Sequence, residues 1–186
     1  MTSSRALKKF LSPEQIEGAL VEVAKMASDS RSDIALIGGV ALQLYGSDRL
    51  TKDVDFVADV PFNGLTDVVE IKIGGYQGKT PSGIPVDVLI GGKYAELREA
   101  SLRSAISEPE LGVAVVRLPY IMALKLVAGR AKDEEDIRTM LRLDVVDVED
   151  TLAVIKRYVG EYAADDFRSV VEEAEWKRDR DRKRDK

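Results

Sequence analysis

The chain has 186 residues, of which 45% are hydrophobic and 33% are charged, a composition typical of one globular domain with its own core. It contains no His and no Cys. This excludes His-dependent catalytic triads, Cys–His nucleophiles, the usual zinc, haem and iron–sulfur sites, and disulfide bonds. An enzyme of this composition would use carboxylates, Lys, Tyr, Ser or Thr, and its metal ion would need oxygen ligands, which favours Mg²⁺ or Mn²⁺.

The net charge of −5 is unevenly distributed: residues 177–186 carry +4 and the other 176 residues carry −9. Two interpretations of this basic tail stay open. Clustered cations can hold an RNA or DNA backbone, or the alternating signs, with Asp179 and Lys183 four residues apart, form a solvated and frayed helix end.

The first 15 residues contain no apolar stretch of the kind found in a signal peptide. No run of the chain approaches the roughly 18 apolar residues that span a membrane. We therefore expect a cytoplasmic protein with no membrane partner.

The predicted elements of the first part of the chain alternate between helices and strands. A capping-box pattern, Ser12-Pro13-Glu14-Gln15, opens the first helix, which ends at about Ser28. The pattern then predicts strands at 34–37, 54–60, 68–73, 84–90 and 113–117, helices at 40–45 and 95–104, and a Gly-, Pro- and Ser-rich loop at 74–83. We expect the strand at 84–90 to pair antiparallel with that at 68–73, as a hairpin.

From Pro119 onward the periodicity is helical, with helices predicted at 119–128, 132–143, 147–158 and 161–178. The predicted fold class is α/β (α+β): a mixed sheet flanked by helices, with a helical C-terminal half. The predicted parts are 1–118 for the first helix and the sheet core, 119–176 for helices packing on that core, and 177–186 for the charged tail.

Gly38 and Gly39 stand between a buried strand and a helix. Glycines let a backbone approach a ligand closely, and a helix start presents free N–H groups, so the pair suits a phosphate. The alternative is a tight strand-to-helix turn with no ligand.

Three carboxylates complete the pattern. Strand periodicity places Asp53 and Asp55 on one face, with Val54 and Phe56 on the other. Asp87 lies in an apolar strand that can run beside them, and an acid in such a strand needs a partner. Converging carboxylates next to a phosphate turn are the parts of two-metal phosphoryl or nucleotidyl transfer, whereas the alternative is a set of structural acids on solvent-facing strands.

The order Gly38-Gly39, thirteen intervening residues, Asp53-Val54-Asp55-Phe56 and a later Asp87 resembles the nucleotidyltransferase fold of the DNA polymerase β superfamily. The fuller form Arg49-Leu50-Thr51-Lys52-Asp53-Val54-Asp55, together with Lys125 and the run Gly129-Arg130-Ala131-Lys132-Asp133, resembles the AbiEii-type nucleotidyltransferases of bacterial toxin–antitoxin systems. The likeness spans residues 34–141. The chain looks short beside full-length toxins of that kind, with a reduced helical acceptor-binding part.

The resemblance implies a role for each matching residue. Asp53 and Asp55 would bind two Mg²⁺ (or Mn²⁺) ions, and Asp87 would bind the catalytic one and act as general base. The implied nucleotide-binding residues, for ATP or another NTP, are Gly38, Gly39, Arg49, Thr51, Lys125, Arg130 and Lys132.

Several of these residues have an alternative without a ligand. Arg49 can pair with Asp48 or Asp53, and Lys125 can extend to solvent from an apolar helix face. Asp133, with Asp136, can form an N-cap and an acidic first turn. Arg130 and Lys132 can be solvated loop charges.

The leading hypothesis is a Mg²⁺-dependent nucleotidyltransferase that moves NMP from an NTP to an acceptor. By resemblance, the acceptor is tRNA or protein, and a cognate antitoxin is a partner. The alternatives are a small-molecule enzyme of the aminoglycoside type and a non-catalytic, antitoxin-like nucleotide-binding protein. The presence of all three carboxylates argues against the last of these.

Overall fold

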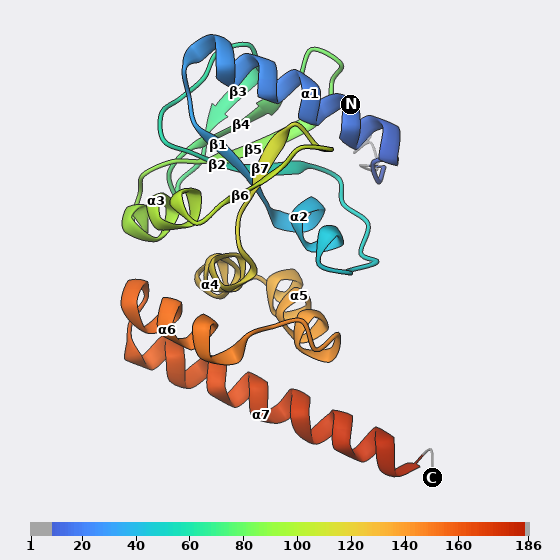
Figure 1. Cartoon of the computed structure of the whole chain (residues 1–186). Helices are drawn as coiled ribbons and strands as arrows, with labels where there is room; N and C mark the ends of the chain where they lie inside the picture. Colours follow the sequence, from blue (N-terminus) through green and yellow to red (C-terminus); the bar gives the residue numbers. More distant parts are fainter. Residues whose placement is uncertain (1–8, 185–186) are drawn as a thin grey trace, which may run out of the picture.

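Seven strands form one mixed sheet, and the helices of the C-terminal half stack below its lower end (Figure 1). The computed structural model describes residues 9–184, with side chains up to residue 180. The strand order is β3-β4-β5-β2-β1-β7-β6. The strands are β1 (Ile34–Ile37), β2 (Val54–Ala58), β3 (Thr66–Glu70), β4 (Tyr76–Lys79), β5 (Pro85–Leu89), β6 (Ile106–Glu108) and β7 (Val113–Val115).

Both parallel and antiparallel pairs occur in the sheet, which confirms the predicted mixed α/β class. β1 runs antiparallel to β2 and parallel to β7, while β2 runs parallel to β5. The remaining pairs, β3–β4, β4–β5 and β6–β7, are antiparallel. Because β1, β2 and β5 are adjacent, chemistry-bearing residues at 37–38, 55 and 87 meet at one place on the sheet.

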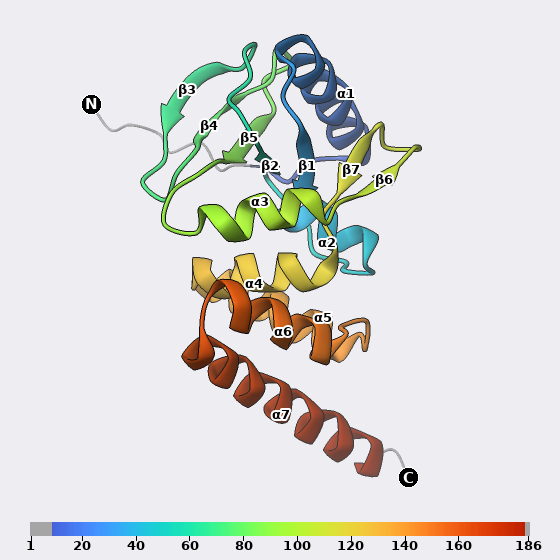
Figure 2. The same ribbon diagram turned by 60° about the vertical axis from the view of Figure 1, so that its left-hand side comes forward.

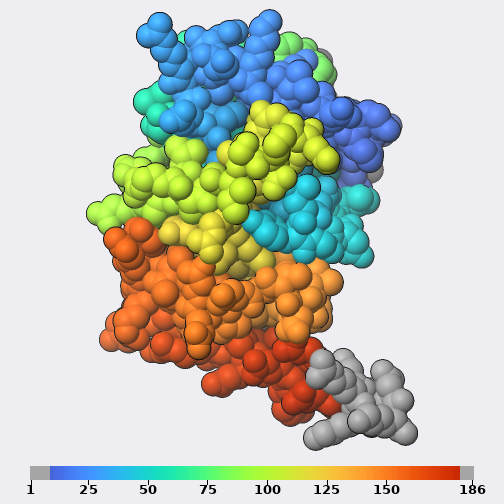
Figure 3. All heavy atoms as spheres, viewed as in Figure 1, coloured from blue at the N-terminus to red at the C-terminus, as the bar shows by residue number. Residues whose placement is uncertain are grey.

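The helices form layers on both sides of the sheet and below it. α1 and α3 lie on opposite faces (Figure 2), and α7 lies at the end of the molecule farthest from α1 (Figure 3). The helices are α1 (Pro13–Ser30), α2 (Gly38–Leu44), α3 (Ala95–Arg103), α4 (Leu118–Ala128), α5 (Ala131–Arg142), α6 (Val148–Tyr158) and α7 (Glu161–Arg184).

Alternation in the central strands separates core from site. In β2, Val54 and Phe56 are fully buried among apolar side chains, whereas Asp55 points to the other face and is partly exposed. The predicted division is therefore confirmed for Val54, Asp55 and Phe56, whereas Asp53 precedes the strand. The predicted capping box at Ser12 and Gln15 is also present.

The predicted hairpin between 68–73 and 84–90 is wrong. β4 lies between β3 and β5, in the segment predicted as a loop. Glycine content hid this strand: Tyr76 and Gly78 alternate as buried positions, and a Cβ at Gly75 would lie 2.0 Å from the Val88 carbonyl oxygen. Only glycine allows the two backbones to approach so closely.

Three smaller differences separate the predicted elements from the observed ones. α2 begins at Gly38 rather than at Val40, and β6 at Ile106–Glu108 was not predicted. α7 continues to Arg184, so the part of the charged tail that the structure describes is helical. Within residues 9–184, no helix is both long and apolar enough to cross a membrane.

Candidate active site

A cavity of about 600 Å³ lies where the sheet meets α3, α4 and α5. It brings together most of the residues singled out in the sequence. Those that line it are Gly38, Gly39, Arg49, Asp55, Asp87, Lys125, Arg130 and Lys132. Thr51 and Asp53 are not part of its lining, and they lie in the loop that leads into β2.

The backbone of Gly38 lies against the carboxylate of Asp55. Gly38 has a φ of 69°, and a Cβ there would lie 1.9 Å from Oδ2 of Asp55. The antiparallel pairing of Ile37 with Asp55 produces this proximity. The Gly-Gly pair therefore does more than close a tight turn, because it makes room for the acid.

Asp87 is the direct neighbour of Asp55 in the parallel register of β2 and β5. Desolvation of the Asp55 carboxylate and repulsion from Asp53 and Asp87, opposed by the charges of Lys125 and Lys132, together raise the pKa of Asp55 to about 7. Crowded carboxylates of this kind favour a bound cation.

Thr51 acts on Asp53. Its hydroxyl oxygen lies 2.9 Å from the backbone carbonyl of Asp53 and 3.1 Å from Oδ1 of the same residue. A Cβ at Gly39 would lie 3.0 Å from the Thr51 hydroxyl oxygen. Thr51 thus orients Asp53 and lies close to Gly39. Thr51 itself does not line the cavity.

The donor set of Asp53, Asp55 and Asp87 fits a hard divalent cation, since carboxylate oxygens are the ligands that Mg²⁺ and Mn²⁺ prefer. The repulsion that raises the pKa of Asp55 would be relieved by such a cation. Within the described residues, however, no three acidic side chains are already arranged as a metal-binding group. The metal site accordingly stays a prediction.

Lys125 lies in a buried ion-pair cluster between α4 and α5. Its Nζ is 2.6 Å from Oδ2 of Asp136 and 3.3 Å from Oδ1 of Asp133. Nε of Arg49 lies 3.0 Å from Oδ1 of Asp136. Arg130 completes the cluster, with its Nε 2.5 Å from Oδ2 of Asp133.

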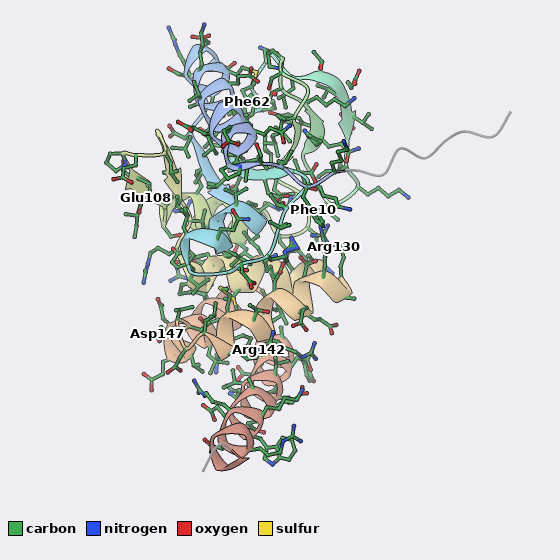
Figure 4. The ribbon with its side chains drawn as sticks, turned by 90° about the vertical axis from the view of Figure 1, so that its right-hand side faces the viewer. Phe10, Phe62, Glu108, Arg130, Arg142 and Asp147 are labelled. Carbon is green, nitrogen blue, oxygen red and sulfur yellow. The ribbon has the colours of Figure 1, made fainter. Side chains whose placement is uncertain are left out.

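These contacts correct four interpretations. Lys125 is only 7% exposed and does not extend to solvent. Arg49 pairs with Asp136, not with Asp48 or Asp53. Arg130, rather than Asp133, is the N-cap of α5, and Asp133 is buried in its first turn. Arg130 is consequently an ion-pair partner rather than a free loop charge, and it lies where the helical half meets the sheet (Figure 4).

The basic tail has local partners. Nζ of Lys177 lies 2.7 Å from Oε1 of Glu173, Arg178 pairs with Asp144, and the guanidinium of Arg180 lies 4.8 Å from the centre of the Trp176 ring. These contacts agree with the solvated helix end for the described side chains. Lys183, the predicted partner of Asp179, lies outside them.

Sequence reasoning missed two buried residues of this region. The sequence indicates Asp136 only as part of an acidic first turn, although its three-residue spacing from Asp133 places both on one helix face. Arg98, on α3, also lines the cavity and is 4% exposed. No local signal marks it, because its partners are backbone carbonyls of distant loops.

No protein-family model and no curated protein sequence match the chain. Among solved structures, an antigenic nucleotidyltransferase-like protein from Paracoccidioides brasiliensis matches with a TM-score of 0.49 and 18% identity, covering 88% of this chain and 95% of that one. A candidate nucleotidyltransferase from H. pylori matches with a TM-score of 0.48 and 18% identity, over 80% and 77% of the two chains. A Thermotoga maritima CCA-adding enzyme complexed with tRNA matches with a TM-score of 0.33 and 13% identity, over 80% and 51%.

All three TM-scores are below 0.5, so the function has to be argued from the cavity itself. What the structure defines directly is a class of site: a carboxylate-bearing cavity beside a glycine turn, with basic residues at its rim.

Proposed function

We propose that this chain is a nucleotidyltransferase that moves NMP from an NTP to a hydroxyl acceptor. One observation carries the proposal: Asp55 and Asp87 are neighbours on β2 and β5, and the backbone of Gly38 lies against Asp55 at the wall of the same cavity. Carboxylates are therefore adjacent to the place where a backbone can cradle phosphate.

In this proposal the acceptor oxygen attacks the α-phosphorus of the NTP. The bond from the α-phosphorus to the oxygen that bridges to the β-phosphate breaks, and pyrophosphate leaves. Asp87 accepts the proton of the attacking hydroxyl. Asp53, Asp55 and Asp87 would hold the divalent cation, which when bound neutralises the charge developing on the phosphates and lowers the pKa of the hydroxyl.

The basic residues have two roles in the proposal. Lys125 and Arg49 share the Asp136 carboxylate as a partner, so neither is a free cation, and they hold α4, α5 and the loop before β2 together. Lys132, with Lys72 and Lys93, lines the cavity with exposed positive charge. Such a rim attracts the NTP and favours an anionic macromolecule such as RNA as the acceptor. The toxin role and the antitoxin partner depend on the sequence resemblance alone.

The test incubates the protein with each of four α-labelled NTPs and Mg²⁺ against tRNA, total protein and aminoglycosides. The proposal expects label to reach one acceptor, and the identity of that acceptor decides between the macromolecular and the small-molecule enzyme. The Asp53→Ala variant is the matched control and should transfer none. Absence of transfer with every NTP, together with absence of NTP binding, would reject the proposal.

A further inference from the structure

Arg98 is a buried cation whose partners are all backbone carbonyls. Its NH2 donates to the carbonyl of Ile73 at 2.8 Å, and its NH1 lies within reach of the carbonyls of Gly74 (3.1 Å), Ile90 (3.2 Å) and Gly91 (2.5 Å). Among the described residues, none of the ion pairs involves Arg98. One guanidinium on α3 thus joins two loops that are distant from each other in sequence.

The glycines of these loops make space for the guanidinium. A Cβ at Gly74 would lie 2.8 Å from NH1 of Arg98, and a Cβ at Gly92 would lie 3.0 Å from the same atom and 2.3 Å from the Ile73 carbonyl oxygen. Both glycines have positive φ, at 98° and 74°. The side chain and the two loops therefore fit each other closely. The unit depends on the planar, forked guanidinium, because its nitrogens contact carbonyls of both loops at once.

The same two loops form one wall of the cavity. Ile71, Lys72 and Ile73 line it from the β3–β4 turn, and Lys93 and Tyr94 line it from the β5–α3 loop. This wall is apolar and aromatic with two lysines. It contrasts with the end of the cavity at Gly38, Asp55 and Asp87, which is polar.

This inference rests on the proposed function. In it, the two ends of the cavity bind different parts of one nucleotide. The triphosphate belongs at the glycines and carboxylates, and the nucleobase, a flat ring with apolar faces, suits the wall of Ile71, Ile73 and Tyr94. We propose that Arg98 is a positioning residue: by holding the carbonyls of residues 73–74 and 90–91, it fixes the wall against which the nucleobase packs.

The wall would be mobile without this contact. Ile73 is 57% exposed and Lys72 is also exposed, so few apolar contacts hold the turn in place. Loss of the guanidinium leaves four backbone carbonyls without this donor and separates the two loops. The expected consequence is a weaker contribution of the base to binding, with the phosphate end unchanged.

The test compares two probes, ATP with Mg²⁺ and inorganic tripolyphosphate with Mg²⁺, by calorimetric titration of the full chain. Arg98→Met should weaken ATP binding about tenfold and change tripolyphosphate binding by less than about twofold. Arg98→Lys should behave like Arg98→Met, because a single ammonium keeps the charge but cannot replace the planar fork.

Two further variants keep the test informative if Arg98→Met does not fold. Ile73→Ala truncates an exposed wall residue and should weaken ATP binding several-fold, without changing tripolyphosphate binding. Val69→Ala is the matched control, since Val69 is 56% exposed on β3 and does not line the cavity. It should change neither.

The outcomes separate the two proposals. If the wild type binds neither probe, the proposed function fails. If the wild type binds both probes equally, or if Ile73→Ala and the Arg98 variants weaken both probes alike or neither, the positioning role of Arg98 is overturned while the phosphate site stands.

Discussion

The Nζ of Lys125 lies 2.6 Å from one carboxylate oxygen of Asp136, and the other oxygen lies 3.0 Å from Nε of Arg49. Asp136 is 2% exposed and Lys125 is 7% exposed. One carboxylate on α5 therefore joins α4 to the loop that precedes β2. Because this loop also carries Thr51 and Asp53, the helical half of the chain helps to place a predicted metal ligand.

Replacing Asp136 tests this connection. Asp136→Asn leaves the buried Lys125 and the partly exposed Arg49 with less charge compensation, so we expect a loss of about 3 kcal/mol in the free energy of unfolding. In a double-mutant cycle with Lys125→Met, measured by urea unfolding, the coupling should exceed about 1 kcal/mol. The exposed pair of Glu99 and Arg103 is the control, and Glu99→Gln should change stability by less than about 0.5 kcal/mol. Additive effects of the two cluster variants would contradict the interpretation.

Asp133 predicts a specific dependence of stability on pH. Burial raises the pKa of Asp133, but the hydrogen bond from Arg130 and the charge of Lys125 lower it by more. The pKa of Asp133 is therefore below its usual value. A carboxyl with a lower pKa when folded stabilises the fold above its unfolded pKa of about 3.9. That contribution disappears as the pH falls through the folded value.

The free energy of unfolding of the wild type should therefore exceed that of Asp133→Asn most clearly above about pH 5, and the difference should shrink toward about pH 3. Urea unfolding at a series of pH values measures it, with Asp29→Asn, an exposed site on α1, as the flat control. A difference between wild type and Asp133→Asn that does not change over this range would rule out the lowered pKa.

The contact between Gly38 and Asp55 is tested by replacing two glycines that both have positive φ, Gly38 and Gly83, with alanine. Ala at position 38 would meet the Asp55 carboxylate, whereas Ala at Gly83 would meet nothing within 4 Å, although its φ is 87°. Gly83→Ala should cost about 1 kcal/mol of stability from backbone strain alone. Gly38→Ala should cost about 1–3 kcal/mol more and should abolish stabilisation by NTP with Mg²⁺ in a thermal-shift assay. Equal effects of the two variants would mean that the close approach is unimportant.

The sequence predicted the parts of the fold that local patterns determine. Alternation at Val54, Asp55 and Phe56 and the capping box at Ser12 are local signals, and both appear in the structure. β4 was not predictable in this way, because the glycines in and before it are typical of a loop. Only the close approach of the neighbouring strand explains why position 75 is a glycine.

The same distinction applies to the candidate site. The convergence of Asp55 and Asp87 followed from strand pairing, which is regular. The partners of Arg49 and Arg98 did not, because Asp136 lies 87 residues beyond Arg49 along the chain, and the carbonyls around Arg98 belong to two separate turns. Ion pairs and carbonyl contacts between distant segments leave no periodicity in a sequence.

Asp55 predicts a conflict between stability and binding. Desolvation of its carboxylate and repulsion from Asp53 and Asp87 raise its pKa, which indicates an unfavourable environment for the charge in the absence of a cation. Asp55→Asn should therefore raise the stability of the ligand-free chain by about 1 kcal/mol, while removing the thermal shift with NTP and Mg²⁺. Thermal unfolding with and without the ligand measures both effects, and Asp29→Asn should change neither. A destabilised Asp55→Asn variant would show that the carboxylate is structural.

Asp87 separates binding from transfer. In the proposed mechanism Asp87 receives the proton of the acceptor, while the phosphates are held at Gly38 and by the basic residues that line the cavity. Asp87→Asn keeps the size and the neighbours of the side chain in β5 but cannot accept that proton.

For Asp87→Asn we expect NTP with Mg²⁺ to bind within about threefold of the wild-type affinity. The rate of label transfer should fall by at least about 100-fold, the usual range for loss of a general base. Calorimetric titration and the transfer assay on the same preparation give the two numbers. Transfer at the wild-type rate would remove Asp87 from the mechanism. Loss of NTP binding together with transfer would overturn its role as general base, because loss of the metal ligand alone would then explain both effects.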